Sequence, residues 1–133
     1  MPAKVLDSFA LIAYFRDEAG AEAVEQLLIS AGKRDTPLHM TDVNYADVKY
    51  SIVKKDGAAA WVEAAKVLEG LPIDFHSTTR ALADTAADFK VRFKLSLADA
   101  FAAALAKEKK AELVTGDPEF KPLEREIKIH WLK

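Results

Sequence analysis

The strongest constraint on the fold is the alternation of short strand-like segments with amphipathic helices along the chain. Apolar runs of strand type occur at residues 4–7, 38–40, 71–75, 113–115 and 127–132. Between these runs, apolar residues recur at the 3.6-residue spacing of helices that bury one face. The alternation predicts an α/β protein of three layers, in which helices cover both faces of a central, mainly parallel sheet of about five strands.

The composition fits an ordinary globular protein and excludes several classes of site. The 133 residues suit a single domain, which we expect to span residues 1–133. The absence of cysteine removes disulfides and thiolate zinc sites. No apolar run reaches the ~18 residues of a membrane span, so we expect a cytoplasmic protein without a membrane partner. With 19 basic and 21 acidic residues, binding to nucleic acid would need a local basic patch.

Local signals predict where several helices begin and end. A side-chain oxygen at the start of a helix can accept a hydrogen bond from a free backbone N–H of the first turn. Hydroxyl residues are therefore predicted to cap four helices, at Ser8, Thr41, Ser77 or Thr78, and Ser96. Residues 90–94 alternate basic and apolar side chains, which predicts a loop or an irregular extended piece. The Ala-rich helix after Ser96 is expected to be buried nearly all round.

Three aspartates are expected at one edge of the sheet, and a fourth faces inward from a helix. Asp7 and Asp117 each follow a predicted strand, and Asp99 lies one turn into the Ala-rich helix. The carboxyl ends of parallel strands line the ligand crevice of an open α/β sheet. Asp47 shares a helix face with Tyr50, which is expected to belong to the core. The four carboxylates are therefore candidates for one common site.

A cluster of carboxylates has a specific chemical meaning. Such groups repel one another unless they are protonated or bridged by cations. Oxygen ligands without cysteine or clustered histidine favour Mg²⁺ or Mn²⁺, and one or two ions would fit. Paired ions can hold both the attacking water and the leaving oxygen of a phosphodiester. The sequence thus predicts metal-dependent phosphodiester hydrolysis, with metal ligands and catalytic residues at Asp7, Asp47, Asp99 and Asp117.

Taken singly, each of these acids also has an ordinary structural explanation. An aspartate after a strand is commonly a turn or cap residue, which would account for Asp7 or Asp117. Asp99 would also interact favourably with the positive end of its helix. Asp47 would be satisfied by a hydrogen bond to neighbouring backbone. Only their meeting in space would indicate a site.

Four segments, in this order along the chain, resemble the motifs of the PIN-domain nucleases. They are VLDS at residues 5–8, VNYADV at 43–48, LSLADA at 95–100 and VTGDPEF at 114–120. The resemblance is closest to the VapC-type toxins of bacterial and archaeal toxin–antitoxin pairs. It implies a parallel α/β sheet, Mg²⁺ or Mn²⁺ bound by the acids, and cleavage of single-stranded regions of tRNA or ribosomal RNA. It also implies inhibition by a cognate antitoxin protein and a homodimer.

The resemblance assigns further residues around the acids. Asp7, Asp99 and Asp117 take the acidic positions of the family. Supporting positions that orient the acids are taken by Ser8, Asn44 and Thr115. The family most often has glutamate where this chain has Asp47, and the missing methylene shortens the reach by ~1.5 Å. Water-mediated contact with a metal is then an alternative to direct contact. The cations nearest the motifs are candidates for phosphate contact, at Arg16, Lys90, Arg92 and Lys94.

The sequence also has to be compared with the requirements of three other functions. The main alternative is a catalytically silent PIN-like module that binds RNA or protein, because the shorter Asp47 would disturb metal geometry. A phosphatase of the haloacid dehalogenase type needs a second aspartate two residues after the first, and Phe9 occupies that position. A receiver domain needs its aspartate at the end of a middle strand, whereas Asp74 lies inside a predicted strand.

Overall fold

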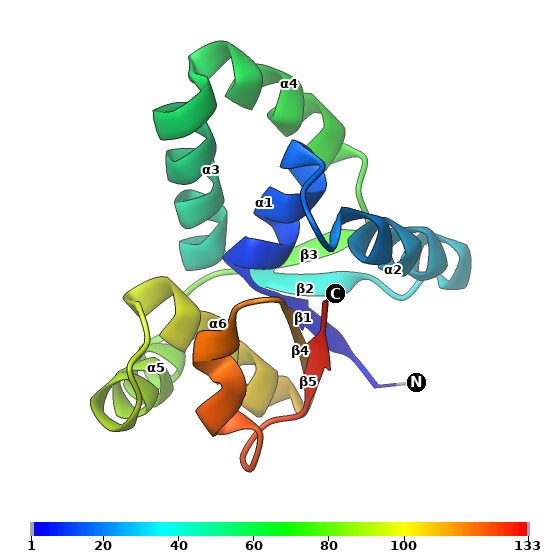
Figure 1. The fold of residues 1–133 in the computed structure, drawn as a ribbon. Helices are drawn as coiled ribbons and strands as arrows, with labels where there is room; N and C mark the ends of the chain where they lie inside the picture. Colours follow the sequence, from blue (N-terminus) through cyan, green and yellow to red (C-terminus); the bar gives the residue numbers. More distant parts are fainter. Residues whose placement is uncertain (1, 133) are drawn as a thin grey trace.

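The computed structural model describes residues 2–132 and shows a five-stranded sheet between two layers of helices (Figure 1). The elements follow in the order β1 (Lys4–Leu6), α1 (Ser8–Arg16), α2 (Ala21–Arg34), β2 (Leu38–Thr41), α3 (Asp42–Asp56), α4 (Ala58–Glu69), β3 (Ile73–His76), α5 (Arg80–Arg92), α6 (Leu97–Lys109), β4 (Glu112–Thr115), the 3₁₀ helix η1 (Pro118–Leu123) and β5 (Ile129–Trp131). The strand order is β3-β2-β1-β4-β5, and every pairing between these strands is parallel. The predicted α/β architecture is confirmed.

Two hydrophobic cores lie on opposite faces of the sheet. Helices α1 to α4 cover one face and α5 and α6 cover the other (Figure 1). The central strand β1 feeds both cores, because successive side chains of a strand point to opposite faces. Val5 packs into the core beneath α5 and α6, and Leu6 packs into the core beneath α1 to α4. Both residues are fully buried, so β1 is fixed in the middle of the molecule.

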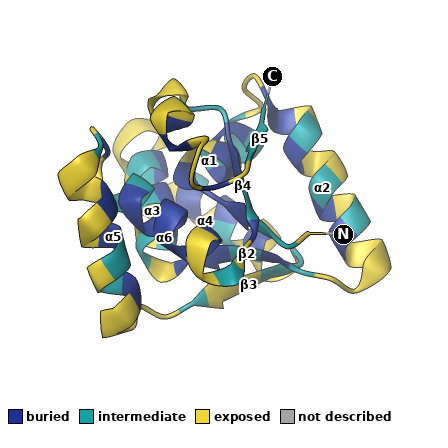
Figure 2. Ribbon diagram, turned by 90° about the horizontal axis from the view of Figure 1, so that it is seen from below, coloured by how far each residue is buried: buried dark blue, intermediate teal, exposed yellow. Residues whose placement is uncertain are grey.

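Helix α6 is buried more completely than the other helices. Every residue from 100 to 106 is buried, and five of these seven are alanine. Small side chains let the backbone of α6 approach its neighbours, which include α5, α3 and strands β1, β2 and β4. Exposed residues lie instead along the outer sides of α2 and α5 (Figure 2). The predicted burial of this helix on nearly all sides is confirmed.

Two of the predicted helix caps are wrong and two are confirmed. Asp7, rather than Ser8, caps α1, because its extended backbone lets the carboxylate accept the Ala10 N–H at 2.8 Å. Thr79, rather than Ser77 or Thr78, caps α5 by accepting from the N–H of residue 82 at 3.0 Å. Thr41 and Ser96 cap α3 and α6 as expected.

The predicted loop or extended piece at residues 90–94 is wrong for residues 90–92, since α5 continues through Arg92, and it is confirmed for residues 93 and 94, which follow the helix with Phe93 in an extended conformation. The guanidinium of Arg92 donates two hydrogen bonds to the Glu126 carboxylate, at 2.7 and 2.8 Å. It also lies 4.9 Å from the ring centre of Phe93 and 5.4 Å from that of Phe89. These contacts hold the last turn of α5 in place.

Within residues 2–132, no helix combines the length and apolar character needed to cross a bilayer.

Candidate active site

Asp7 lies at the middle of the carboxyl edge of the sheet, directly after the central strand β1. Its side chain is fully buried, and both carboxylate oxygens accept hydrogen bonds. Oδ1 accepts from the Ala10 N–H at 2.8 Å, and Oδ2 accepts from the Thr115 hydroxyl at 2.5 Å. The same residue therefore begins α1 and presents a carboxylate where β1 and β4 end.

Thr115 connects this buried acid to the next one along the edge. It ends β4, the neighbour of β1, and is itself fully buried. While its hydroxyl donates to Asp7, its oxygen accepts the Asp117 N–H at 3.0 Å. The Asp117 carboxylate accepts in turn from the Glu119 N–H at 2.9 Å and so caps η1. One hydroxyl thus fixes the relative position of two predicted site acids.

Asn44 joins the three helices that surround the acids. Its Nδ2 donates to the Ser8 hydroxyl oxygen of α1 at 2.9 Å and to the Ala98 carbonyl of α6 at 3.1 Å. Its Oδ1 accepts a short hydrogen bond from Thr41 at the start of α3. Ala98 directly precedes Asp99, so this buried network sets the position of the Asp99 backbone. Ser8 contacts Asn44 rather than a carboxylate, and it supports the acids only through that amide.

The charges at this edge strongly influence one another. Burial raises the pKa of Asp7 to about 7, against the opposing hydrogen bonds from Thr115 and Ala10, and the charges of Asp99 and Asp117 raise it further. A carboxyl group with a pKa near neutrality is poised to exchange its proton for a cation. Such shifts are common at functional sites, although structural networks also produce them.

The pKa of Asp99, in the first turn of α6, is raised in the same way. Burial is the main cause that raises the pKa of Asp99 to about 6, while a hydrogen bond with Ser96 lowers it. The charges of Asp117, Asp47 and Glu119 raise it further. The charges of Asp99 and Asp117 therefore act on Asp7, and the charge of Asp47 acts on Asp99. Glu119 is an additional acid that sequence reasoning missed, although it lies only two residues beyond Asp117.

The expected orientation of α3 needs a correction. Tyr50 is 60% exposed rather than part of the core, because α3 buries a different stripe formed by Asn44, Val48 and Ile52. Asp47 is half-buried beside that stripe. Its charge raises the pKa of Asp99 on the neighbouring helix α6.

The donor chemistry of this edge fits a hard divalent cation. The five acids offer only oxygen donors, and their mutual repulsion is what a cation would relieve. Among residues 2–132, no three acidic or histidine side chains are already gathered tightly enough to hold a metal ion. Mg²⁺ commonly keeps several waters and uses one or two carboxylates. These acids therefore fit a divalent ion that they bind partly through water.

The cations predicted to contact phosphate mostly have partners within the protein. Arg16 pairs with Asp56, with Nε 3.2 Å from the carboxylate. Lys90 donates to a backbone carbonyl at 2.8 Å, and Arg92 holds the bidentate pair described above. Lys94 is exposed in the segment that leads into α6. Phosphate would have to compete with existing partners at three of these four positions.

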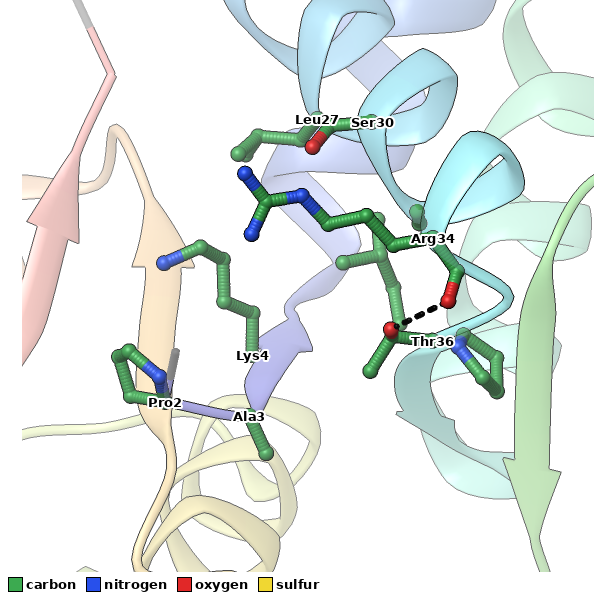
Figure 3. A pocket seen from close by; sticks show the side chains of 10 residues that line it. Pro2, Ala3, Lys4, Leu27, Ser30, Arg34 and Thr36 are labelled. Atoms are coloured by element: carbon green, nitrogen blue, oxygen red, sulfur yellow. Dashed lines mark hydrogen bonds between the residues drawn. The ribbon is translucent and has the colours of Figure 1, made fainter.

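A cavity of about 340 Å³ lies at the opposite end of the sheet (Figure 3). The start of β1, the end of α2 and the start of β2 line it. The side chains of Lys4 and Arg34 reach toward it from two of these elements (Figure 3). Because Lys4 begins β1 and Asp7 follows its end, this cavity is separate from the acids.

Comparison with known proteins agrees with the fold. In VapBC2 of Rickettsia felis, solved with a DNA fragment from its promoter, the matching chain is 12% identical, with a TM-score of 0.78 over 98% of this chain and 99% of that one. The Mycobacterium tuberculosis toxin VapC20, described as cleaving the sarcin–ricin loop, is 17% identical, with a TM-score of 0.74 over 90% and 94%. VapBC-1 of nontypeable Haemophilus influenzae is 15% identical, with a TM-score of 0.69 over 97% of each chain.

These identities are low, and they establish a common fold rather than a common substrate. No curated protein matches the sequence significantly. The PIN-domain family model, in contrast, matches residues 4–126, a span that contains all the acids described above. The chain therefore belongs to the PIN-domain family.

Proposed function

We propose that the protein is a metal-dependent endoribonuclease, and that it acts as the toxin of a toxin–antitoxin pair. Its substrate would be single-stranded regions of RNA of the tRNA or ribosomal RNA class. The observation that carries this proposal is that Asp99 and Asp117 lie near enough to the buried Asp7 for their charges to raise its pKa, and that Asp117 also raises the pKa of Asp99. Membership of the PIN-domain family supports the same reaction class.

Each residue of the site has a defined part in this proposal. Asp7, Asp99 and Asp117, with Asp47 through water, would hold one or two Mg²⁺ or Mn²⁺ ions. A bound ion would neutralise phosphate charge and lower the pKa of a coordinated water. Thr115 holds Asp7 and the backbone of Asp117 in register. Asn44, anchored by Ser8, holds the start of α6 against α1.

RNA would be attracted mainly by the ion and by local cations, because the chain carries a net charge of −2. Lys94 is the first candidate for phosphate contact, since it is exposed close to Asp99 in the sequence. Arg16, Lys90 and Arg92 would contribute by exchanging their present partners for phosphate.

Partners and assembly follow from the same proposal. The chain is similar in fold to VapBC structures, among them VapBC-5 of Mycobacterium tuberculosis, described as a member of a toxin–antitoxin family. A cognate antitoxin protein is therefore the proposed inhibitor. We also propose a homodimer that acts in the cytoplasm.

Cleavage of RNA by the purified, antitoxin-free protein tests the function. Structured RNAs are incubated with Mg²⁺ or Mn²⁺ and with chelator, using the wild-type chain, Asp99→Asn and Asp35→Asn. The last variant makes the same chemical change at an exposed position between α2 and β2, at the opposite end of the sheet. We expect cleavage that needs metal, disappears in Asp99→Asn and persists in Asp35→Asn. Metal-independent cleavage, or equal loss in both variants, would contradict the proposal.

A silent binding module is the second candidate. It is favoured by the absence, within the described residues, of three side chains already gathered around a metal position, and by the short reach of Asp47. The variant Asp47→Glu separates the two functions. If the wild-type chain binds RNA without cutting it and Asp47→Glu restores cleavage, the silent module is correct.

A further inference from the structure

Phe9 is an exposed aromatic residue close to Asp7 in the sequence, and packing in the two hydrophobic cores does not account for it. It is the second residue of α1, two positions after the buried Asp7. The residue is 40% exposed, and it belongs to neither of the two hydrophobic clusters that flank the sheet. Leu11, two residues later on α1, is by contrast fully buried.

The ring of Phe9 rests on the turn that carries Asp117. A Cβ atom added at Gly116 would lie 2.8 Å from Cζ and 3.1 Å from Cδ1 of the ring, and nearer still to Cε1. Real Cβ atoms essentially never make contacts shorter than 3.0 Å, so the ring occupies the space that a side chain at position 116 would take. One edge of the ring is therefore held against the backbone between Thr115 and Asp117, and the exposed remainder faces solvent.

An aromatic ring at this position supplies what the acids lack. The carboxylates repel the phosphates of an approaching strand, whereas stacking on a base is insensitive to that charge. Every base presents a π-face, and stacking on an aromatic side chain is a common mode of single-strand binding. Bases within a duplex are already stacked and paired, so only an unpaired base can reach the ring.

We propose that Phe9 stacks on an unpaired base adjacent to the scissile phosphate. This inference rests on the proposed nuclease function. The ring belongs to α1, which begins directly after Asp7, and it contacts Gly116, the residue before Asp117. A base seated on it would place its own phosphate over the acids. Phe9 is thus a positioning residue that restricts cleavage to loops and other unpaired segments.

Substitutions of Phe9 separate stacking from packing. Phe9→Leu keeps an apolar side chain over Gly116 but removes the π-face, and Phe9→Trp keeps the π-face. In the Asp99→Asn background, we measure binding of a single-stranded RNA that contains 2-aminopurine, whose fluorescence is quenched by stacking. Phe9→Leu should weaken binding by about 5- to 150-fold and abolish the quenching, in line with the usual strength of base–aromatic stacking. Phe9→Trp should retain both.

The matched control is Phe75→Leu, since Phe75 is 37% exposed on β3 and packs against Tyr45, away from the acids. This variant should leave binding and quenching unchanged, and thermal unfolding confirms that each variant is folded. If the wild-type chain cleaves RNA and Phe9→Leu matches it in KM and quenching, the stacking role is overturned while the nuclease stands. If the wild-type chain neither binds nor cleaves RNA, both proposals fail.

Discussion

At the scale of single residues, the buried charge of Asp7 lowers the stability of the folded protein. A fully buried carboxylate is costly unless it is paired or protonated. Its two hydrogen bonds from Ala10 and Thr115 compensate only partly, since the pKa of Asp7 is still raised to about 7. A residue selected only for stability at this position would be neutral. The retained charge is consistent with a role in binding a cation.

Asp7→Asn tests this cost directly. The pKa of Asp7 in the folded state, about 7, exceeds the ordinary value of 3.8. Its protonation therefore favours folding, and this contribution is present below pH 4 and is lost as the pH rises through 7. The amide removes the charge, and it can still accept from Ala10 and donate to Thr115. Without metal, Asp7→Asn should therefore raise the free energy of unfolding at pH 8, by up to about 4 kcal/mol.

At pH 5, where Asp7 is mostly protonated, the same substitution should change stability much less. Urea unfolding in the presence of chelator, at pH 5 and at pH 8, measures both values. Comparing the variant with the wild-type chain at each pH cancels the titration of groups that do not interact with Asp7. An equal change at the two pH values would show that the buried charge is not the cause.

At the scale of elements, α6 positions Asp99 through close packing. Its alanines at 102, 103 and 104 have no exposed surface, so the backbone lies as near its neighbours as side chains allow. Ser96 caps the helix and Asn44 holds the preceding carbonyl at Ala98. The direction of the Asp99 carboxylate thus depends on the helix as a whole.

Enlarging a buried alanine of α6 should therefore damage both stability and activity. Ala103→Leu inserts three carbon atoms where no space exists, which typically costs about 1–3 kcal/mol. The displaced helix would also move Asp99, so RNA cleavage should fall more than the loss of folded protein explains. Ala59→Leu, on the exposed side of α4, is the matched control and should leave both nearly unchanged. Chemical unfolding and cleavage rates, measured on the same samples, check this expectation.

The elements that the sequence predicted correctly are those with local signals. The alternation of strands and helices, and the caps at Thr41 and Ser96, depend on neighbouring residues only. The end of α5 does not, because Arg92 is held by Glu126, which is 34 positions away. The start of α1 was misplaced because Asp7 and Ser8 are both good caps. Backbone conformation, which the sequence does not reveal, decides between them.

At the scale of the whole molecule, strand order explains why so much of the site was predictable. Acids that follow parallel strands meet at one edge whatever the sequence distance between them, which brings Asp7 beside Asp117. The network of Asn44 and the ring of Phe9 on Gly116 depend on how helices pack over that edge. Sequence reasoning therefore predicted acids at this edge, but it missed the neighbouring Glu119 and the position of the aromatic ring.

Anomalous scattering from Mn²⁺ in crystals of the protein would show whether these acids hold a divalent cation. We predict an anomalous peak bounded by Asp7, Asp99 and Asp117, and its loss in crystals of Asp99→Asn. Mg²⁺ added in excess should displace the signal. A fully ordered site with no peak at this edge, or a peak unaffected by Asp99→Asn, would contradict the account.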